Sequence, residues 1–238
     1  MRALKFAAIV GAGMTIAGVA FAGPWNDPAG RVNFTAPSGW VTEAQRSPAN
    51  QTTVLTGNAN NECYVFTSRN AGTASAPANR VHALTDPMPA ADWQALANVN
   101  VQMFPHHNAS VTSQSVDTSG FWPLQIAQLS GAERPVIAAI SHRPGGLDLV
   151  GMCWTYDGPD ATATYQALFH SMGNPGDAAW QAAASQQDAA QSAAQQAANA
   201  QAAQQAQQPQ QQTQAQREAA RGRNGHARGE GPSLRSPD

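Results

Sequence analysis

The sequence predicts an α+β domain in which a mainly antiparallel sheet of about six to seven strands packs with two helices, followed by an Ala/Gln-rich helical or disordered tail. Three observations predict this fold class. Short segments rich in β-branched and aromatic residues alternate with a period of two, and the turns between them are short, as in antiparallel sheets. Two further segments carry apolar residues at helical spacing. The composition then changes abruptly near residue 177, so the globular domain is predicted over residues 23–176.

The first 22 residues have the pattern of a secretory signal peptide. Arg2 and Lys5 precede an apolar run over residues 6–21, and the segment 20–22 has the small-x-small sequence that signal peptidase recognises. The run is shorter than the ~20 residues that span a bilayer, so an uncleaved anchor is the less favoured alternative. We therefore expect cleavage after Ala22 and a periplasmic or secreted protein with no transmembrane segment in the mature chain.

Residues 147–156 form the best strand candidate, because their side chains alternate and both faces are largely apolar. This pattern is typical of a central strand. The strand contains Cys153, and the second of the two cysteines, Cys63, lies in a similar segment. In an exported protein this pair predicts a Cys63–Cys153 disulfide, with two buried free thiols as the alternative. The wide spacing of the two cysteines and the absence of a CxxC sequence argue against zinc.

The other elements follow in order. A turn-rich opening over residues 23–30 precedes short strands at 31–35 and 51–56 and the Cys63 strand at 62–69. Residues 71–89 are expected to form a loop before a helix from about 89 to 104, which carries Trp93, Leu96 and Ala97 on one face and ends at Pro105. The remaining predicted strands are 110–116, 121–130, 135–142 and 147–156. The second helix is expected to begin with Pro159 in its first turn, to bury Tyr165, Leu168 and Met172, and to end before Pro175.

The tail is a low-complexity segment. Between Ala178 and Gln216 there are sixteen Gln and sixteen Ala residues, and Trp180 is the only large apolar side chain. Ala and Gln favour a helix, which Pro209 is expected to interrupt. Residues 177–216 are thus interpreted as a solvated spacer, with a weak coiled coil or a partner-binding helix as the alternative. The Arg/Gly-rich residues 217–238 are predicted to be disordered.

The segment Val32-x-Phe34-x-x-Pro37-x-Gly39-Trp40 resembles the opening of PsbP-like domains, which begin with a strand, a Pro-containing turn and a Trp. The predicted order of elements over about residues 30–174 is also similar to that superfamily. The resemblance implies an antiparallel sheet flanked by helices and a binding or accessory role. It implies no catalytic residues, since the superfamily shares none, and it covers neither the cysteine pair nor the tail.

Charge and motifs exclude several function classes. Residues 23–177 hold eleven acidic residues against six arginines, which argues against nucleic acid as the main partner. The sequence contains no nucleophile elbow and no Gly-rich phosphate loop, so we expect no catalytic residue, no cofactor and no enzyme activity. A metal site is not expected either; His106 and His107 are the candidates, if the fold supplies further ligands.

Aromatic residues are the better indication of binding. Trp25 lies in the turn-rich opening, and Phe121 and Trp122 begin a strand after a flexible turn, where exposed aromatic side chains are enriched at binding sites. The alternative is that the tryptophans build the core. We therefore expect a non-catalytic domain that binds a protein or cell-envelope component. The two alternatives are a small-molecule-binding domain with a pocket between the sheet and the helix around Trp93, and an enzyme of unrecognised type that uses the loop histidines.

Overall fold

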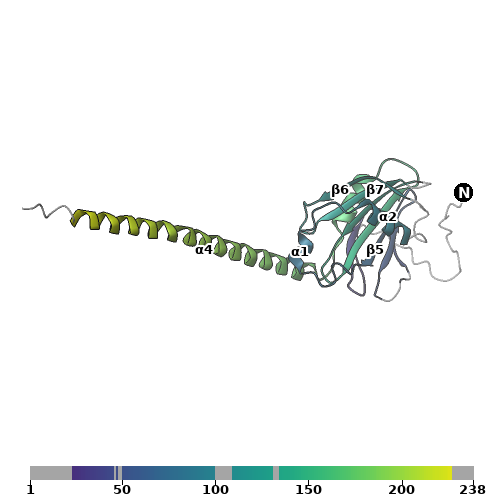
Figure 1. Cartoon of the computed structure of the whole chain (residues 1–238). Coiled ribbons are helices and arrows are strands. Elements are labelled where there is room, and N and C mark those ends of the chain that lie inside the picture. The colour runs from purple at the N-terminus through teal and green to yellow at the C-terminus, as the bar shows by residue number, and fades with distance from the viewer. Residues whose placement is uncertain (1–22, 46, 48–49, 100–108, 131–133, 227–238) are drawn as a thin grey trace, which may run out of the picture. The chain divides into compact units, whose positions relative to one another are not determined.

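The computed structural model describes residues 23–45, 47, 50–99, 109–130 and 134–226 (Figure 1). The predicted signal peptide, His106, His107 and residues 227–238 therefore lie outside the described residues. The helices are α1 (Ala78–His82), α2 (Ala90–Val99), α3 (Thr162–His170) and α4 (Asp177–His226). The strands are β1 (Gly23–Asn26), β2 (Asn33–Ala36), β3 (Val41–Gln45), β4 (Thr53–Gly57), β5 (Asn61–Arg69), β6 (Ser110–Asp117), β7 (Leu124–Ser130), β8 (Pro135–Ser141) and β9 (Leu147–Thr155).

The predicted α+β class and the antiparallel sheet are confirmed. Seven strands form one sheet in the order β3-β4-β5-β9-β8-β7-β6, and every neighbouring pair is antiparallel. Strand β9 is the fourth of the seven, as its two apolar faces predicted. Strands β1 and β2 form a separate two-stranded sheet.

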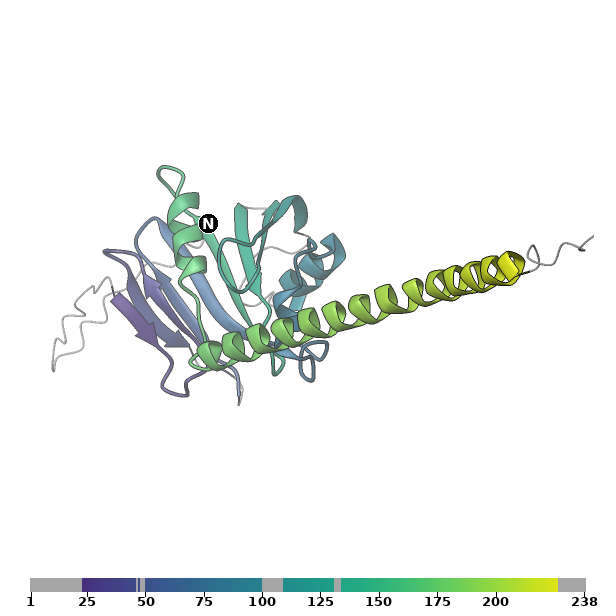
Figure 2. The same ribbon diagram turned by 90° about the vertical axis from the view of Figure 1, so that its left-hand side faces the viewer.

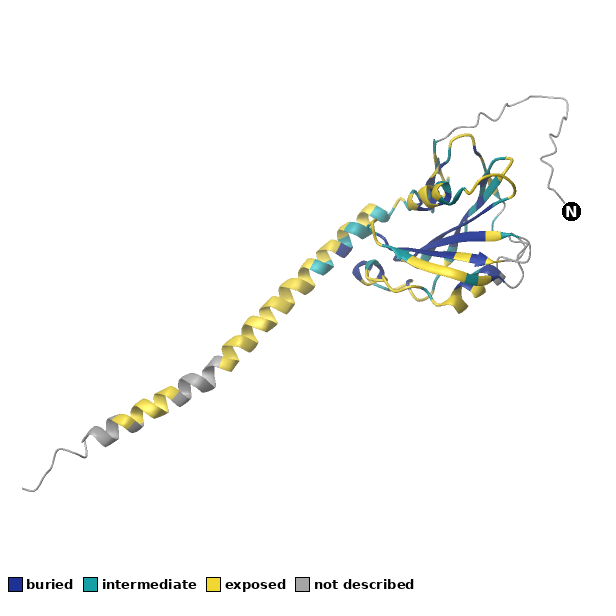
Figure 3. Cartoon of the chain, turned by 90° about the horizontal axis from the view of Figure 1, so that it is seen from above, coloured by how far each residue is buried: buried dark blue, intermediate teal, exposed yellow. Residues whose placement is uncertain are grey.

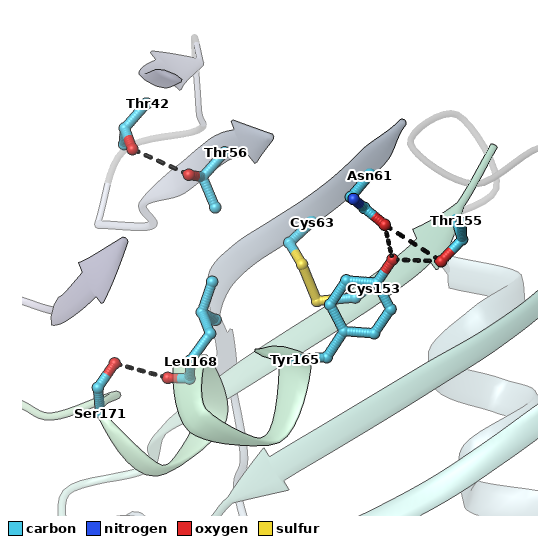
Figure 4. Close-up of a disulfide and its surroundings, with 9 residues drawn as sticks. All are labelled: Thr42, Thr56, Asn61, Cys63, Cys153, Thr155, Tyr165, Leu168 and Ser171. Carbon is cyan, nitrogen blue, oxygen red and sulfur yellow. Dashed lines mark hydrogen bonds between the residues drawn. A yellow bond between two sulfur atoms is a disulfide. The ribbon is translucent and has the colours of Figure 1, made fainter. Parts of the chain in front are cut away.

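A disulfide joins the two central strands. In the register of β5 with β9, Cys63 lies directly opposite Cys153, with a Cα–Cα distance of 4.1 Å, and both residues are fully buried (Figure 4). Beside the disulfide, the Tyr165 hydroxyl of α3 donates to Asn61 Oδ1 at 2.7 Å and lies 2.7 Å from Thr155 Oγ1. The predicted disulfide is thus formed, which is consistent with an oxidising compartment.

Each face of the sheet is covered by one of the short helices (Figure 2). On one face, Leu149 and Cys153 of β9 pack in a cluster with Leu168 and Phe169 of α3 and with β2. On the other face, Val150 and Met152 of β9 pack with Trp93 and Ala97 of α2. The alternating side chains of β9 thus contribute to both halves of the core.

The α3 face depends on a glycine at the centre of β9. An ideal Cβ on Gly151 would collide with the Phe169 ring and lie 3.3 Å from Met172 Sδ. Both Phe169 and Met172 are buried, so neither side chain can move away into solvent. The absence of a side chain at residue 151 therefore allows α3 to approach the sheet closely.

Several local predictions were wrong. The opening segment contains β1, because Gly23–Asn26 pairs with Asn33–Ala36 instead of forming a turn. Strand β3 was not predicted because it is an edge strand without a clean apolar alternation; Val41 is 55% exposed. The expected loop contains the five-residue α1. Helix α3 begins at Thr162, and Asp160 precedes it and accepts a hydrogen bond from the Thr162 backbone N–H at 2.9 Å.

The C-terminal helix α4 begins within the first compact unit of the chain, which ends at Ala184. Trp180 and the buried Ala184 pack with Ala78 and Val81 of α1, which continues this unit beyond the boundary expected at residue 176. The second unit is Ser185–Asp238, and its side chains in α4 are mostly exposed (Figure 3). None of the helices in the described part of the chain has both the length and the apolar character needed to cross a membrane.

Helix α4 also corrects two predictions about the tail. It passes Pro209, which was expected to interrupt it, and it extends to His226, although disorder was predicted from Arg217. The residues after Pro209 are mainly Gln, Ala, Glu and Arg up to the first glycine at 222. These are strong helix formers, so the local propensity outweighs the single proline.

Removal of the disulfide is expected to destabilise the first unit by about 4–5 kcal/mol, because the bond closes a loop with a sequence separation of 90 residues. Urea unfolding of the wild type with and without reductant measures this difference. A Cys63→Ala/Cys153→Ala variant is the control, since reductant must leave its unfolding curve unchanged. An intact mass at the value of the free thiols, or equal stability with and without reductant, would contradict the prediction.

Substitution Gly151→Ala is expected to lower the free energy of unfolding by roughly 1–3 kcal/mol, because a methyl group at this position overpacks the Phe169 contact. Gly120→Ala is the matched control: the nearest atom to its added Cβ is 3.8 Å away, at ordinary contact distance. Both variants can be compared by urea unfolding monitored by circular dichroism. Equal stability of the two variants would show that α3 can move away from the sheet without loss.

Candidate functional site

A cavity of about 160 Å³ lies between the sheet and the helices α3 and α4. We call it the Arg143 pocket. Its lining comes from the β6–β7 loop, β7, β8, the β8–β9 loop, the end of α3 and the start of α4. The lining residues are Gly120, Phe121, Trp122, Leu124, Ser141, Arg143, Phe169, His170, Met172, Asp177 and Gln181. All of them belong to the first compact unit.

Arg143 is a buried cation in the wall of this pocket, and its side chain is only 3% exposed. Its Nε donates to Asp177 Oδ1 at 2.9 Å, and its Nη2 donates to the Met172 carbonyl at 3.4 Å. Nη1 donates to Ser141 Oγ and to the His142 carbonyl. Burial lowers the pKa of the Arg143 guanidinium, and the Asp177 and Asp148 carboxylates oppose this effect. The pairing with Asp177 thus compensates the charge that burial would otherwise leave isolated.

A second carboxylate, that of the buried Asp148, holds the loop that carries Arg143. Asp148 Oδ1 accepts the backbone N–H of Arg143 at 3.2 Å, and Asp148 Oδ2 lies 2.8 Å from His142 Nδ1. Asn70 Nδ2 also donates to Asp148 Oδ2 at 2.8 Å. These contacts join β9, the β8–β9 loop and the segment after β5. The position of the guanidinium is therefore determined by the surrounding fold.

Trp122 presents a buried donor at the same place. The residue is 7% exposed, and its Nε1 is buried without a hydrogen-bond partner among the described residues. The Arg143 Cζ lies 5.4 Å from the centroid of the Trp122 ring, in a cation–π contact. Phe121 packs edge-to-face on Trp122 at 5.2 Å and stacks on His82 at 4.3 Å. The Trp122 ring therefore forms part of the pocket wall beside the guanidinium, whereas its Nε1 is buried and carries the desolvation cost of an unmatched N–H.

Two further polar side chains, His170 and Ser141, line the pocket. His170 Nε2 lies 3.1 Å from Asp117 Oδ2, and both side chains are about one-third exposed. Hydrogen bonds from Ser119 lower the pKa of Asp117. Ser141 Oγ donates to the Pro123 carbonyl and accepts from Arg143, so its proton is directed away from a base. This arrangement differs from that of an activated nucleophile, in which the hydroxyl donates to its base.

The structure places the predicted aromatic residues differently. Phe121 and Trp122 lie together in the Arg143 pocket, whereas Trp25 packs on Phe34 in the core cluster of the α3 face, with ring centroids 5.4 Å apart. Trp93, around which a pocket was considered, is 1% exposed in the packed cluster under α2. The cavity between sheet and helix lies instead beside α3. Among the described residues, no group of three or more His, Cys, Asp or Glu side chains is placed to hold a metal ion.

Sequence reasoning missed the two charged residues of the pocket. Arg143 follows the predicted strand 135–142 and was not singled out, and Asp177 was assigned to the start of the tail. The two are separated by 34 residues, and neither belongs to a motif. The one available indication was an arginine placed directly after the apolar strand at residues 135–142, where a charge is expected to need a partner.

Comparison with solved structures finds a weak resemblance of fold. The solution structure of cyanobacterial PsbP (CyanoP) from Synechocystis is similar with a TM-score of 0.45 and 14% sequence identity, over 66% of this chain and 95% of that chain. A crystal structure from Bacteroides thetaiotaomicron is similar with a TM-score of 0.36 and 9% identity, over 65% of this chain and 49% of that chain, so the match spans about half of its length. No protein-family model matches the sequence, and the search of curated proteins found no match. The resemblance to a PsbP-like fold expected from the sequence is thus seen at the level of the fold and over part of the chain.

Substitution Asp177→Asn is expected to destabilise the protein by roughly 3–5 kcal/mol, because it leaves the buried Arg143 guanidinium without its carboxylate. Asp86→Asn is the matched control, since Asp86 is exposed. Thermal and urea unfolding of both full-length variants measure the effect. If Asp177→Asn were as stable as Asp86→Asn, the ion pair would contribute nothing to the start of α4.

Proposed function

We propose that this protein is an exported, non-catalytic binding module that holds a small group of a protein or cell-envelope partner in the Arg143 pocket. The observation that carries the proposal is the cavity itself, in which the buried ion pair of Arg143 and Asp177 lies beside the aromatic side chains of Phe121 and Trp122. Phe121 and Trp122 are two of the three aromatic residues that the sequence predicted to bind; the third, Trp25, lies outside the pocket.

The size of the pocket favours a group that belongs to a larger molecule. Its volume of about 160 Å³ is larger than the ~10–15 Å³ that one water needs and smaller than the ~300–1,000 Å³ of pockets for drug-sized ligands. A side chain, a chain end or a sugar substituent fits this range. A freely diffusing small molecule is the second candidate, since the cavity lies between the sheet and the helices.

Two further features support a partner in the cell envelope: the oxidising compartment that the disulfide suits, and the long C-terminal part of α4. The Cys63–Cys153 disulfide suits an oxidising compartment, as does the predicted signal peptide. The part of α4 from Ser185 to His226 has mostly exposed side chains, and at 1.5 Å per residue it extends about 60 Å. Its polar composition suits a spacer that extends the reach of the module.

Crosslinking and capture from envelope extracts tests the proposal with four full or shortened chains: wild type, Trp122→Phe, Trp25→Phe and a chain ending at Ala184. Trp122→Phe replaces the indole ring that lines the pocket and contacts Arg143 with a smaller ring, and we expect it to retain at least tenfold less partner than the wild type. Trp25→Phe is the control, because Trp25 lies outside the pocket. Equal capture by both tryptophan variants would contradict a role for the pocket.

The shortened chain separates the two parts of the proposal. The core clusters are formed by residues 25–184, so this chain retains all of them. Retention of the partner by the shortened chain is expected and would leave α4 as a spacer. Loss of the partner with the tail would assign binding to residues 185–238. Capture of nothing by the wild type would exclude a stable macromolecular partner and favour the free small molecule.

A further inference from the structure

Side chains of β3 and β4 on the α2 face of the sheet are partly exposed to solvent. Tyr64 lies opposite Met152 in the β5–β9 register, so it shares the face on which Met152 packs with α2. Leu55 of β4 lies opposite Tyr64, and Glu43 of β3 lies opposite Leu55. Helix α2 contacts β6 at one edge of the sheet, whereas β3 forms the other edge. We call the partly exposed surface at this edge the β3 patch; its residues are Val41, Glu43, Leu55, Glu62, Tyr64 and Tyr156.

Two carboxylates lie in the β3 patch. Glu62 precedes Tyr64 by two residues in β5, so it lies on the same face, and its Oε2 accepts the Tyr156 hydroxyl at 2.6 Å. Glu43 of β3 is exposed. Both glutamates line a cavity of about 20 Å³ between β3, β4 and β5. This volume is close to the ~10–15 Å³ that one water needs, so the cavity suits the end of one side chain and not a whole small molecule.

The β3 patch already accommodates one guanidinium. Arg134 Cζ lies 4.4 Å from the centroid of the Tyr156 ring, and Arg134 Nη1 donates to the Tyr156 carbonyl at 3.3 Å. Val41, which is 55% exposed, and Leu55 add apolar surface next to the two carboxylates. Aromatic rings, aliphatic side chains and carboxylates are the groups that bind the guanidinium of an arginine and its apolar stem. The patch therefore suits further arginine side chains.

The complementary charge lies near the end of this same chain. Residues 23–177 hold eleven acidic residues against six arginines, whereas residues 217–228 hold four arginines against one glutamate. Arg217 and Arg221 are exposed on α4, and because they are four residues apart they lie on one side of the helix. The end of α4 is therefore an exposed pair of guanidinium groups in a basic segment.

The spacing of the two pairs of charges also matches. Glu43 and Glu62 lie on β3 and β5, which are two strand spacings apart, or about 10 Å. The long side chains of Arg217 and Arg221 extend from neighbouring turns of one helix, so they can diverge to reach both carboxylates.

The length of α4 favours a second copy of the chain as the source of these arginines. Arg217 lies 33 residues beyond Ala184, the last residue of the first compact unit, which is about 50 Å along a helix axis. A domain the size of residues 23–184 has a radius of gyration of about 15 Å. An unbent α4 can thus deliver its arginines to another molecule.

We propose that the β3 patch binds the arginine-bearing end of α4, residues 217–223, of a second copy of this chain. Arg217 and Arg221 pair with Glu43 and Glu62, and their stems pack on the aliphatic side chains of the patch. Each copy carries one patch and one tail end, so the contact is heterologous and joins copies head to tail, into open chains or a ring. The inference goes beyond the proposed function, because the β3 patch shares no residue with the Arg143 pocket.

Sedimentation velocity of the chain from Gly23 to Asp238 tests the inference. We expect the average mass to rise with protein concentration and to pass that of a dimer, because a head-to-tail contact leaves a free patch and a free tail end on every assembly. The contact joins exposed charges, so the association is expected to weaken at least tenfold between 0.1 M and 1 M salt, where the Debye length falls from about 10 Å to about 3 Å.

Two charge-neutralising variants connect the association to the patch. The patch variant, Glu43→Gln/Glu62→Gln, removes both carboxylates while keeping the size of the side chains and an oxygen that can accept the tyrosine hydroxyl, and we expect it to associate at least tenfold more weakly. Asp86→Asn/Asp92→Asn is the matched control, since it removes the same charge from two exposed residues outside the patch, and it must associate as the wild type does.

A tail variant supplies the other half of the contact. Arg217→Gln/Arg221→Gln changes only two exposed side chains of α4, so it leaves the core intact, and we expect it to remain monomeric as well. An equimolar mixture of the patch variant and the tail variant restores one intact patch and one intact tail end. The mixture is therefore expected to form a one-to-one dimer that grows no further.

Three results would overturn the inference. A wild type that stays monomeric at every concentration would exclude a second copy and leave the patch to a basic segment of another protein. Unchanged association of the patch variant would place the contact elsewhere on the globular unit. Unchanged association of the tail variant would show that copies meet without these arginines, for example by pairing of the α4 helices.

Discussion

The pairing of β5 with β9 is the constraint on which the rest of the structure depends. It spans nine residue pairs from Asn61↔Thr155 to Arg69↔Leu147 and places the two cysteines opposite each other. Because side chains alternate along a strand, a shift of one residue would exchange the α3 face and the α2 face and would separate Cys63 from Cys153. The disulfide therefore fixes the β5–β9 register, and this register determines which face of the sheet packs against α3 and which packs against α2. The same register places Gly151 under Phe169, and Phe169 forms part of the pocket wall.

The sequence predicted the fold where pattern and burial agree. The period of two in residues 147–156 identified the central strand, and the spacing of Tyr165 and Leu168 identified the buried side of α3. The sequence-based prediction failed for elements that form through pairing with another strand and lack an apolar periodicity of their own. Strand β3 (Val41–Gln45) has few buried side chains, since it pairs only with β4 at the sheet edge, and its Thr42 hydroxyl lies 2.9 Å from the Thr56 hydroxyl. An edge strand with few buried side chains lacks the clear alternation of apolar and polar residues from which strands are predicted.

The pocket was predictable only in its aromatic part. Phe121 and Trp122 adjoin a flexible turn, which is a local feature, so sequence reasoning could single them out. The Arg143–Asp177 pair depends on three separate elements meeting at one end of the sheet: the β8–β9 loop, the residues after α3 and the first turn of α4. Neither hydrophobic periodicity nor a sequence motif indicates that these three segments lie close together in the fold. The pair explains why the tail begins as part of the globular unit, because the first residue of α4 neutralises the buried arginine.

Two tryptophans show why an unmatched donor alone does not define a site. Trp93 and Trp122 both have a buried Nε1 without a partner among the described residues. Trp93 belongs to α2 and packs against the sheet among apolar side chains, where burial of its large ring favours folding despite the unmatched N–H. Trp122 instead borders a cavity and contacts a buried guanidinium, so its ring forms part of a pocket wall although its Nε1 is buried. The free volume beside a neutralised buried cation, and not the unmatched donor, therefore distinguishes the Arg143 pocket from the close packing around Trp93.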